Sequence, residues 1–282
     1  MPSRVQESFA ALRARNARGL MPFVTAGDPD LADLPDVLAA LEAAGATAVE
    51  VGVPFSDPVA DGPVIAASMQ HALRAGVTVA GLMEAVATAR ERVSIPLVAM
   101  LSYSIVYRLG LDAFCRRAAE AGFDGLILPD LGLEESGPAR EAAAAAGLTL
   151  SLLVAPSTPP ERAAAIAAAS TGFVYVVSRA GITGADSGPP EGLAERVEQL
   201  RARTDLPLAV GFGISDASQV AAVVEVADAA IVGSALTRAL EGFRGDGHAA
   251  AAEAAGAFVR GLAEGLPTPS PSPSPAGAAA PA

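Results

Sequence analysis

Residues 49–62 read VEVGVPFSDPVADG, a stretch in which an apolar strand runs into a loop. The valines at its start favour a strand, whereas the prolines, the Ser-Asp pair and the closing glycine favour a loop. Glu50 therefore lies near the end of a strand, and Asp57 and Asp61 lie on the loop that leaves it. Glutamate is a poor strand former and is rarely buried without a partner, so its position indicates a functional carboxylate. The alternative is a salt-bridged strand residue followed by two turn aspartates.

On both sides of this stretch, short apolar segments alternate with helical patterns. The expected strands cover residues 20–26, 49–52, 96–101, 125–128, 149–154, 172–178, 208–210 and 229–232. Strict alternation predicts an α/β fold with parallel pairing, and eight repeats in 282 residues favour a closed barrel over an open doubly wound sheet. No Gly-x-Gly-x-x-Gly turn follows the first strand, which also argues against the open sheet. We therefore expect a (β/α)8 TIM barrel with an added N-terminal helix over residues 3–15 and an extra helix after strand two.

The composition changes towards the C-terminus. A last helix is expected over residues 249–262, and the sequence then becomes PTPSPSPSPAGAAAPA. Such a segment has too few apolar side chains to bury and is typical of disorder. We expect one barrel domain over residues 1–265 and a disordered Pro/Ser/Ala-rich tail over residues 266–282.

Charge and cysteine content limit the possible settings and partners. The net charge of -12 argues against nucleic acid or an anionic membrane as a partner. The single cysteine, Cys115, excludes an intramolecular disulfide and fits a reducing compartment. The N-terminus lacks the apolar region of a signal peptide, and no apolar run reaches the length of a membrane span. We therefore expect a cytoplasmic protein.

The basic residues are unusual, because all 19 of them are arginines. Schiff-base chemistry needs a lysine amine, so this chain cannot form a Schiff base with a carbonyl substrate or with pyridoxal phosphate. The two histidines, His71 and His248, lie far apart in helical segments, which argues against a histidine-based zinc site. We expect no metal, and we expect any carbon–carbon cleavage to depend on carboxylates and hydrogen bonds.

Three glycine-containing loops follow the expected strands six, seven and eight, at residues 180–184, 211–215 and 233–235. Glycine lets backbone amides approach a phosphate closely, and a helix N-terminus favours negative charge. A phosphate site after strands seven and eight recurs in this type of barrel. One such glycine would only mark the end of a strand, but three loops at adjacent strand ends favour a substrate that carries phosphate.

The opening stretch resembles the signature of the tryptophan synthase alpha subunit. That signature is an aliphatic-Glu-aliphatic-Gly strand, an aromatic-Ser-Asp-Pro turn and an Asp-Gly pair, which match VEVG at residues 49–52, FSDP at 55–58 and DG at 61–62. The resemblance extends from about Phe9 to Leu240. It implies retro-aldol cleavage of indole-3-glycerol phosphate to indole and glyceraldehyde 3-phosphate in tryptophan biosynthesis. It also implies an alpha2-beta2 heterotetramer in which only the beta subunit binds pyridoxal phosphate, and no cofactor on this chain.

The resemblance implies roles for residues at the strand ends. Glu50 would carry both proton transfers, Asp61 would accept the indole N–H, and Tyr175 would orient Glu50 or the substrate. The implied substrate-binding residues are Phe23, Met100, Leu101, Thr183, Gly184, Phe212, Gly213, Gly233 and Ser234. The two phenylalanines and either Met100 or Leu101 would hold the indole. The glycines and Ser234 would surround the phosphate, and Thr183 would belong to a loop that closes over the substrate.

Two loops depart from the family pattern. Ser102 and Ser104 stand where the family usually has tyrosine and asparagine, and Gly132 stands where a proline is usual. In the family these loops lie towards the beta subunit, so the first alternative is a stand-alone lyase that releases indole without a partner. The second alternative, from a different class, is a catalytically silent barrel that acts as an activator. Intact Glu50 and Asp61 argue against the silent barrel.

Overall fold

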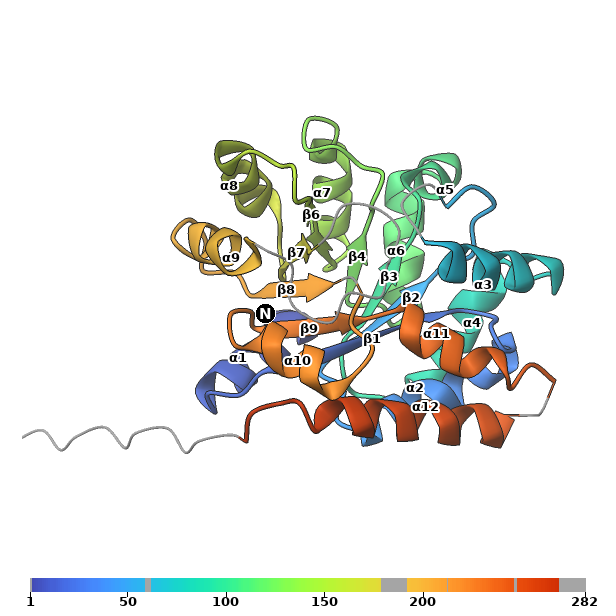
Figure 1. Ribbon diagram of the computed structural model, residues 1–282. Coiled ribbons are helices and arrows are strands. Elements are labelled where there is room, and N and C mark those ends of the chain that lie inside the picture. The colour runs from blue at the N-terminus through green and yellow to red at the C-terminus, as the bar shows by residue number, and fades with distance from the viewer. Residues whose placement is uncertain (1, 59–61, 179–191, 212, 246–247, 269–282) are drawn as a thin grey trace, which may run out of the picture.

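The structure is a computed structural model that describes residues 2–58, 62–178, 192–211, 213–245 and 248–268. Its described strands form one parallel sheet that curves around a common axis (Figure 1). The strands are β1 (Gly19–Thr25), β2 (Val49–Gly52), β3 (Leu97–Met100), β4 (Gly125–Ile127), β5 (Thr149–Ser151), β6 (Leu153–Val154), β7 (Val174–Val177), β8 (Leu208–Gly211) and β9 (Ala229–Val232). They are short and apolar because helices cover the outside of the sheet.

The barrel closes through a strand that is interrupted at Leu152. The order of the sheet is β5-β4-β3-β2-β1-β9-β8-β7-β6. Strand β5 pairs with β4, whereas β6 pairs with β7, and only Leu152 separates β5 from β6. The two halves act as one barrel strand that joins both edges of the sheet. The eight-stranded barrel predicted from the sequence is therefore confirmed.

Helices surround the strands, and η1 (Leu31–Asp33) is a short 3-10 turn before the second of them. The helices are α1 (Arg4–Ala14), α2 (Leu34–Ala43), α3 (Pro63–Arg74), α4 (Val79–Ala89), α5 (Tyr103–Leu109), α6 (Leu111–Ala121), α7 (Ser136–Ala145), α8 (Pro160–Ala169), α9 (Leu193–Arg201), α10 (Ala217–Val224), α11 (Ser234–Glu241) and α12 (His248–Ala263). The added N-terminal helix is α1. The extra helix is also confirmed, because both α3 and α4 stand between β2 and β3. The last helix, α12, lies along α2 on the outside of the barrel (Figure 1).

One end of the barrel is closed by α1. A reciprocal capping box between Ser3 and Gln6 begins this helix, and its buried face consists of Val5, Phe9 and Leu12. These three side chains join the cluster that fills the barrel interior, and the ring of Phe9 lies 5.9 Å from that of Phe173. Because α1 covers the end at which the strands begin, the opposite end, where the strands finish, is left for a binding site.

Two features differ from the sequence expectation. The segment between β3 and α6 forms the additional helix α5, which begins at Ser102 with the Ser102 hydroxyl accepting from the backbone N–H of Ser104. Strand five is divided, as described above.

Among the described residues no single helix has the length and apolarity of a membrane span. Helices α3 and α4 reach that length and apolarity only when taken together, and the chain bends by 100° between them. Residues 269–282, most of the expected tail, lie outside the described residues.

Candidate active site

Glu50 lies in the middle of β2 and belongs to the inner face of the barrel. Its neighbours in the chain, Val49 and Val51, are part of the outer core between strands and helices. In the sheet, Glu50 pairs in register with Phe23 on β1 and with Val98 on β3, two residues of the inner clusters. The alternation of side chains along a strand therefore directs the carboxyl into the barrel.

The Glu50 carboxyl is buried and has no polar partner in the described part of the chain. Its side chain is 1% exposed, and neither carboxyl oxygen forms a hydrogen bond with any residue that the structure describes. Burial disfavours the charged form and raises the pKa of Glu50 from 4.5 to about 8. At neutral pH this carboxyl therefore keeps its proton and can act as a general acid, since its pKa lies near the working pH.

Apolar side chains form a wall beside this carboxyl. Phe23, Ile65 and Met69 are buried together, and Phe55 and Met100 pack against them; we call these five residues the apolar wall. The wall joins β1, β3 and helix α3 at the end of the barrel where the strands finish. An aromatic and aliphatic surface of this kind suits a flat apolar ring such as indole.

Gly52 is required by the position of the Phe23 ring. A Cβ atom at residue 52 would lie 2.4 Å from Cζ of Phe23. The two residues stand on adjacent strands, where Gly52 pairs with Thr25 rather than with Phe23 itself. The ring therefore leans over the glycine, and only a residue without a side chain leaves that space.

Met100 and Leu101, the two alternatives for the third indole contact, lie in different parts of the core. Met100 belongs to the apolar wall, whereas Leu101 is buried in the outer core between strands and helices. Ile65 and Met69 were not expected in the site from the sequence. Their spacing of four on a helix that directly follows the Asp61 loop was the available signal, because such residues share one helix face.

Tyr175 lies on the other side of the barrel from Glu50. It is 7% exposed, belongs to the inner cluster, and pairs in register with Leu153 and Ala209. A Cβ atom at Gly211 would lie 2.5 Å from the Tyr175 hydroxyl. The hydroxyl therefore reaches the last residue of β8, next to the loop that contains Gly213.

The described part of the expected phosphate site lies at neighbouring strand ends. Gly213 follows β8 and has a φ of 80°, which favours glycine. Gly233 follows β9 and precedes Ser234, the first residue of α11. A Cβ atom at Gly233 would be 3.6 Å from Cβ of Phe23, so the start of α11 lies close to the apolar wall. The expected site residues Asp61, Thr183, Gly184 and Phe212 lie outside the described residues.

Comparison with known proteins identifies this arrangement. The profile of the tryptophan synthase alpha chain family matches residues 9–266. The chain belongs to the tryptophan synthase alpha chain family. A tryptophan synthase alpha chain from Geobacter sp. (strain M21) is 42% identical over 264 residues, which cover 94% of this chain and 98% of that relative. One from Chloroflexus aggregans is 48% identical over 240 residues, which cover 85% and 90%.

Solved tryptophan synthase structures share the fold. A structure of Mycobacterium tuberculosis tryptophan synthase has a TM-score of 0.84 with 38% identity and covers 94% of this chain and 98% of that one. The tryptophan synthase subunit alpha of Legionella pneumophila str. Paris has a TM-score of 0.85 with 32% identity and the same coverage. The chain is thus a lyase of tryptophan biosynthesis that cleaves indole-3-glycerol phosphate to indole and glyceraldehyde 3-phosphate.

The loops that depart from the alpha chain pattern form a local hydrogen-bond network. Asp130 accepts from the Ser102 hydroxyl at 2.6 Å and from the backbone N–H of Tyr103 at 2.7 Å. The hydroxyls of Ser102 and Ser104 are 2.7 Å apart. Asp130 therefore fixes the start of α5 from the end of the neighbouring strand β4. Gly132 lies in the same loop, where a Cβ atom would lie 2.4 Å from a carboxyl oxygen of Glu135.

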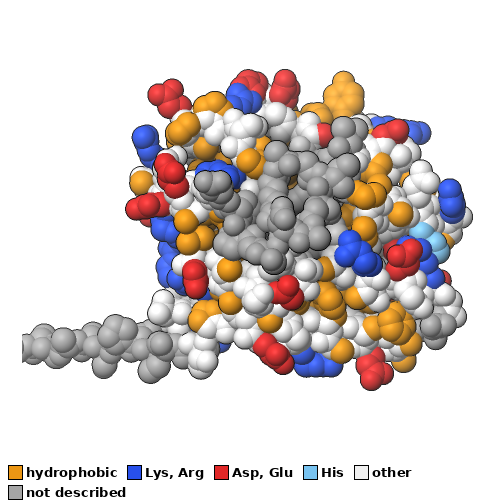
Figure 2. Space-filling view, viewed as in Figure 1, with side chains coloured by type: hydrophobic (Ala, Val, Ile, Leu, Met, Phe, Trp, Pro, Cys, Tyr) orange, Lys and Arg blue, Asp and Glu red, His pale blue; other side chains and the backbone are white. Residues whose placement is uncertain are grey.

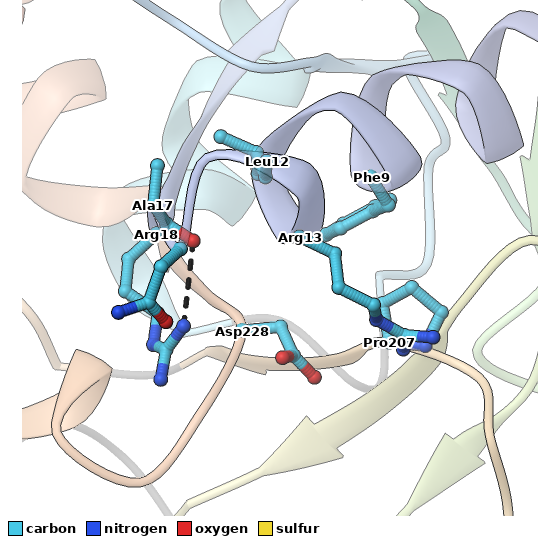
Figure 3. A pocket seen from close by; sticks show the side chains of 8 residues that line it. Phe9, Leu12, Arg13, Ala17, Arg18, Pro207 and Asp228 are labelled. Atoms are coloured by element: carbon cyan, nitrogen blue, oxygen red, sulfur yellow. Dashed lines mark hydrogen bonds between the residues drawn. The ribbon is translucent and has the colours of Figure 1, made fainter. Parts of the chain in front are cut away.

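A surface pocket lies at the opposite end of the alpha chain barrel, where α1 packs (Figure 3). The guanidinium groups of Arg13 and Arg18 lie at its margin, and the Asp228 carboxylate lies between them (Figure 3). Arg13 donates to the carbonyl of Asp205 at 2.9 Å, and Arg18 donates to that of Val224 at 3.1 Å. Because backbone carbonyls and a carboxylate accompany these cations, the pocket is poorly suited to the substrate phosphate.

The described residues contain no group of three or more His, Cys, Asp or Glu side chains placed to hold a metal ion. On the face shown in Figure 2, acidic and basic side chains are interspersed around the rim.

Proposed function

We propose that Glu50 carries both proton transfers of the lyase reaction and begins from its protonated form. The neutral carboxyl donates its proton to indole C3, which leaves a positive charge on the ring. The bond between C3 and the glycerol carbon then breaks, and its electron pair neutralises the ring. At the same time the Glu50 carboxylate takes the hydroxyl proton of that carbon, which becomes the aldehyde. Glu50 ends protonated again, so the cycle needs no cofactor on this chain.

The observation that carries this proposal is the burial of the Glu50 carboxyl, with no hydrogen-bond partner for either oxygen among the residues that the structure describes. A carboxyl held by an arginine would remain ionised and would be a poor acid. Here burial raises the pKa of Glu50 to about 8, so one group can give and take the same proton near neutral pH. The apolar wall supports the proposal, because it offers an aromatic ring a place beside this carboxyl.

Other residues hold and polarise the substrate in this proposal. Asp61 accepts the indole N–H and stabilises the positive ring. Gly213, Gly233 and Ser234 surround the phosphate, which the N-terminus of α11 favours electrostatically. Tyr175 positions the glycerol part of the substrate, a role supported by its hydroxyl reaching Gly211 near the phosphate loops.

The pH dependence of the lyase reaction tests the role of Glu50. We expect kcat/KM for indole release to fall above about pH 8, because Glu50 in the free enzyme then loses the proton that the reaction requires. The alkaline limb is the diagnostic one, since the substrate phosphate itself titrates near about pH 6. A kcat/KM that rises with ionisation near about pH 4.5 and then stays level would show that the ionised carboxylate is the active form.

We also propose that the chain works with a beta subunit that binds pyridoxal phosphate, in an alpha2-beta2 complex. The absence of lysine supports a separate cofactor-binding chain, because this chain cannot form a Schiff base. Helix α5 offers a surface for such a partner, since Tyr107 is 72% exposed and Leu109 is 41% exposed. The buried, free thiol of Cys115 is in keeping with a cytoplasmic location.

Titration with the beta subunit of the same organism tests this partnership. We expect a low basal rate of indole release that rises when the beta subunit is added. The family resemblance implies that the partner contacts the loop that contains Asp57, and such a contact would position Asp61. A coupling of about 1–3 kcal/mol corresponds to a rise of roughly 5–150-fold. A rate that is high alone, unchanged by the partner and accompanied by no complex in mass measurements, would instead favour the stand-alone lyase.

A further inference from the structure

A partly buried ion pair connects the first loop of the barrel with the end of α11. The Asp28 carboxylate, 1% exposed, accepts from Nε of Arg244 at 2.7 Å and from Nη2 at 2.8 Å. Two parallel bonds of this kind fix direction as well as distance. Arg244 also reaches Glu241 at 3.2 Å, on the last turn of α11. The two partners are 216 residues apart in the chain, so this is a link between distant elements.

The pair anchors α11 at the end far from the expected phosphate. At its near end, Gly233 lies against Phe23 on β1, with 3.6 Å between the Cβ of Phe23 and a Cβ built on the glycine. At its far end, Arg244 follows the helix and holds Asp28 in the loop after β1. Helix α11 also packs along β1 and α3 between these points (Figure 1). The near end of the helix therefore contacts β1, and its far end is held by the loop that follows β1.

The loop that contains Asp28 is itself held by α3. His71 on α3 lies with its Nε2 3.1 Å from the carbonyl oxygen of Pro29. Gly27 packs closely against the turn between α3 and α4. A Cβ atom at Gly27 would lie 2.4 Å from a methyl carbon of Val77 in that turn. Since α3 also carries two residues of the apolar wall, the same loop connects the indole side of the site with α11.

We propose that the Asp28–Arg244 pair is a brace that positions the N-terminus of α11 for the substrate phosphate. Arg244 is thus a positioning residue that acts through α11 and does not touch the substrate. The inference rests on the proposed phosphate site after β8 and β9. It concerns only the phosphate half of the substrate, because the indole half is assigned to the apolar wall.

The chain offers a matched control at the opposite end of the barrel. Arg90 forms an ion pair with Asp124, and the two side chains are 12% and 7% exposed. Asp124 precedes β4 and also accepts from the backbone N–H of Leu97 at 2.9 Å. Arg90 is less exposed than Arg244, and the Arg90–Asp124 pair lies where the strands begin, so its loss should affect folding stability and leave the phosphate site alone.

The experiment compares Arg244→Met with Arg90→Met and follows the reverse reaction, in which indole and glyceraldehyde 3-phosphate are separate substrates. Arg244→Met should raise KM for glyceraldehyde 3-phosphate about tenfold and leave KM for indole and kcat nearly unchanged, because only uniform phosphate binding is lost. Arg90→Met should lower the melting temperature with both KM values intact. Arg244→Lys should recover part of the phosphate affinity, because an ammonium can pair with Asp28 without the bidentate geometry.

The affinity for glycerol 3-phosphate, measured by calorimetry, tests the brace independently of turnover. We expect about tenfold weaker binding to Arg244→Met than to the parent chain. A parent chain without lyase activity would sink the proposed function, and the ratio of the two affinities would still report on the brace. Equal affinities of the parent chain and Arg244→Met, or equal rises in both KM values of the variant, would overturn the proposal that this pair is a brace. Should Arg244→Met fail to fold, the double variant Asp28→Asn with Arg244→Gln removes both charges and is measured against the same expectations.

Discussion

Glu50→Gln is expected to abolish indole release while the barrel stays folded. The amide has nearly the same shape as the carboxyl but cannot give its proton to indole C3 or take one from the hydroxyl. Loss of a general acid–base group typically costs about 10²–10⁴-fold in rate, and here one group serves both steps. The measurement is kcat for indole release by the purified variant, together with its affinity for glycerol 3-phosphate, which should be unchanged.

The same substitution is expected to stabilise the fold, with a defined dependence on pH. The pKa of Glu50 is about 8 in the folded chain, above the ordinary value of 4.5. Between these two values the unfolded chain has released the proton and the folded chain retains it, so folding stability falls as pH rises. Each pKa unit corresponds to about 1.4 kcal/mol. Glu50→Gln removes this penalty, so its advantage in melting temperature should grow from about pH 4.5 to about pH 8 and then level off.

Glu134 provides the control for this behaviour. Its side chain is exposed and paired with Arg162, whose hydrogen bonds lower the pKa of Glu134 to about 2. Glu134→Gln should therefore retain lyase activity and show no gain in stability between about pH 4.5 and about pH 8. A gain in Glu134→Gln equal to that in Glu50→Gln would show that general charge reduction, and not the burial of Glu50, is the cause.

Gly52→Ala is expected to damage the indole side of the site selectively. The new methyl group would lie 2.4 Å and 2.7 Å from two ring carbons of Phe23, so the ring must move. Ile65 and Met69 pack against that ring and limit its movement. Overpacking of this kind costs about 1–3 kcal/mol in stability, and the displaced ring should raise KM for indole about tenfold in the reverse reaction. KM for glyceraldehyde 3-phosphate should stay close to that of the parent chain.

The matched glycine is Gly137, in helix α7, where an added Cβ would meet no atom within 4 Å. Gly137→Ala should leave both KM values unchanged and should not lower stability, since alanine favours a helix more than glycine does. The expected pattern for Gly52→Ala is the mirror image of that for Arg244→Met. If Gly52→Ala raised the two KM values equally, Phe23 could not be assigned to the indole half of the site.

Local patterns in the sequence were sufficient to predict the barrel. Eight apolar segments, each followed by a helical pattern, specify parallel pairing because every segment must be covered on both faces. Glu50 stood out for the same reason, as an acid inside one of those segments. The apolar surface beside it was only partly predicted, because Ile65 and Met69 could equally have faced any other part of the core.

The features that the sequence did not reveal depend on contacts between distant residues. Helix α5 is short, and its start is fixed by Asp130, which lies 27 residues beyond Tyr103 and accepts from its backbone N–H. The interruption of strand five is accompanied by a hydrogen bond from the backbone N–H of Leu152 to the hydroxyl of Ser170. The pairing of Asp28 with Arg244 likewise has no local signal. Such contacts become visible only when the chain is folded.

A measurement of the protonation state of Glu50 tests the proposed acid–base mechanism most directly. Infrared difference spectra between the parent chain and Glu50→Gln isolate the carboxyl of this one residue, because the rest of the chain cancels. We expect the band of a protonated carboxylic acid at neutral pH, replaced by carboxylate bands with a midpoint near about pH 8. A carboxylate spectrum already present at neutral pH, with a midpoint near about 4.5, would contradict the proposal that Glu50 begins the reaction as an acid.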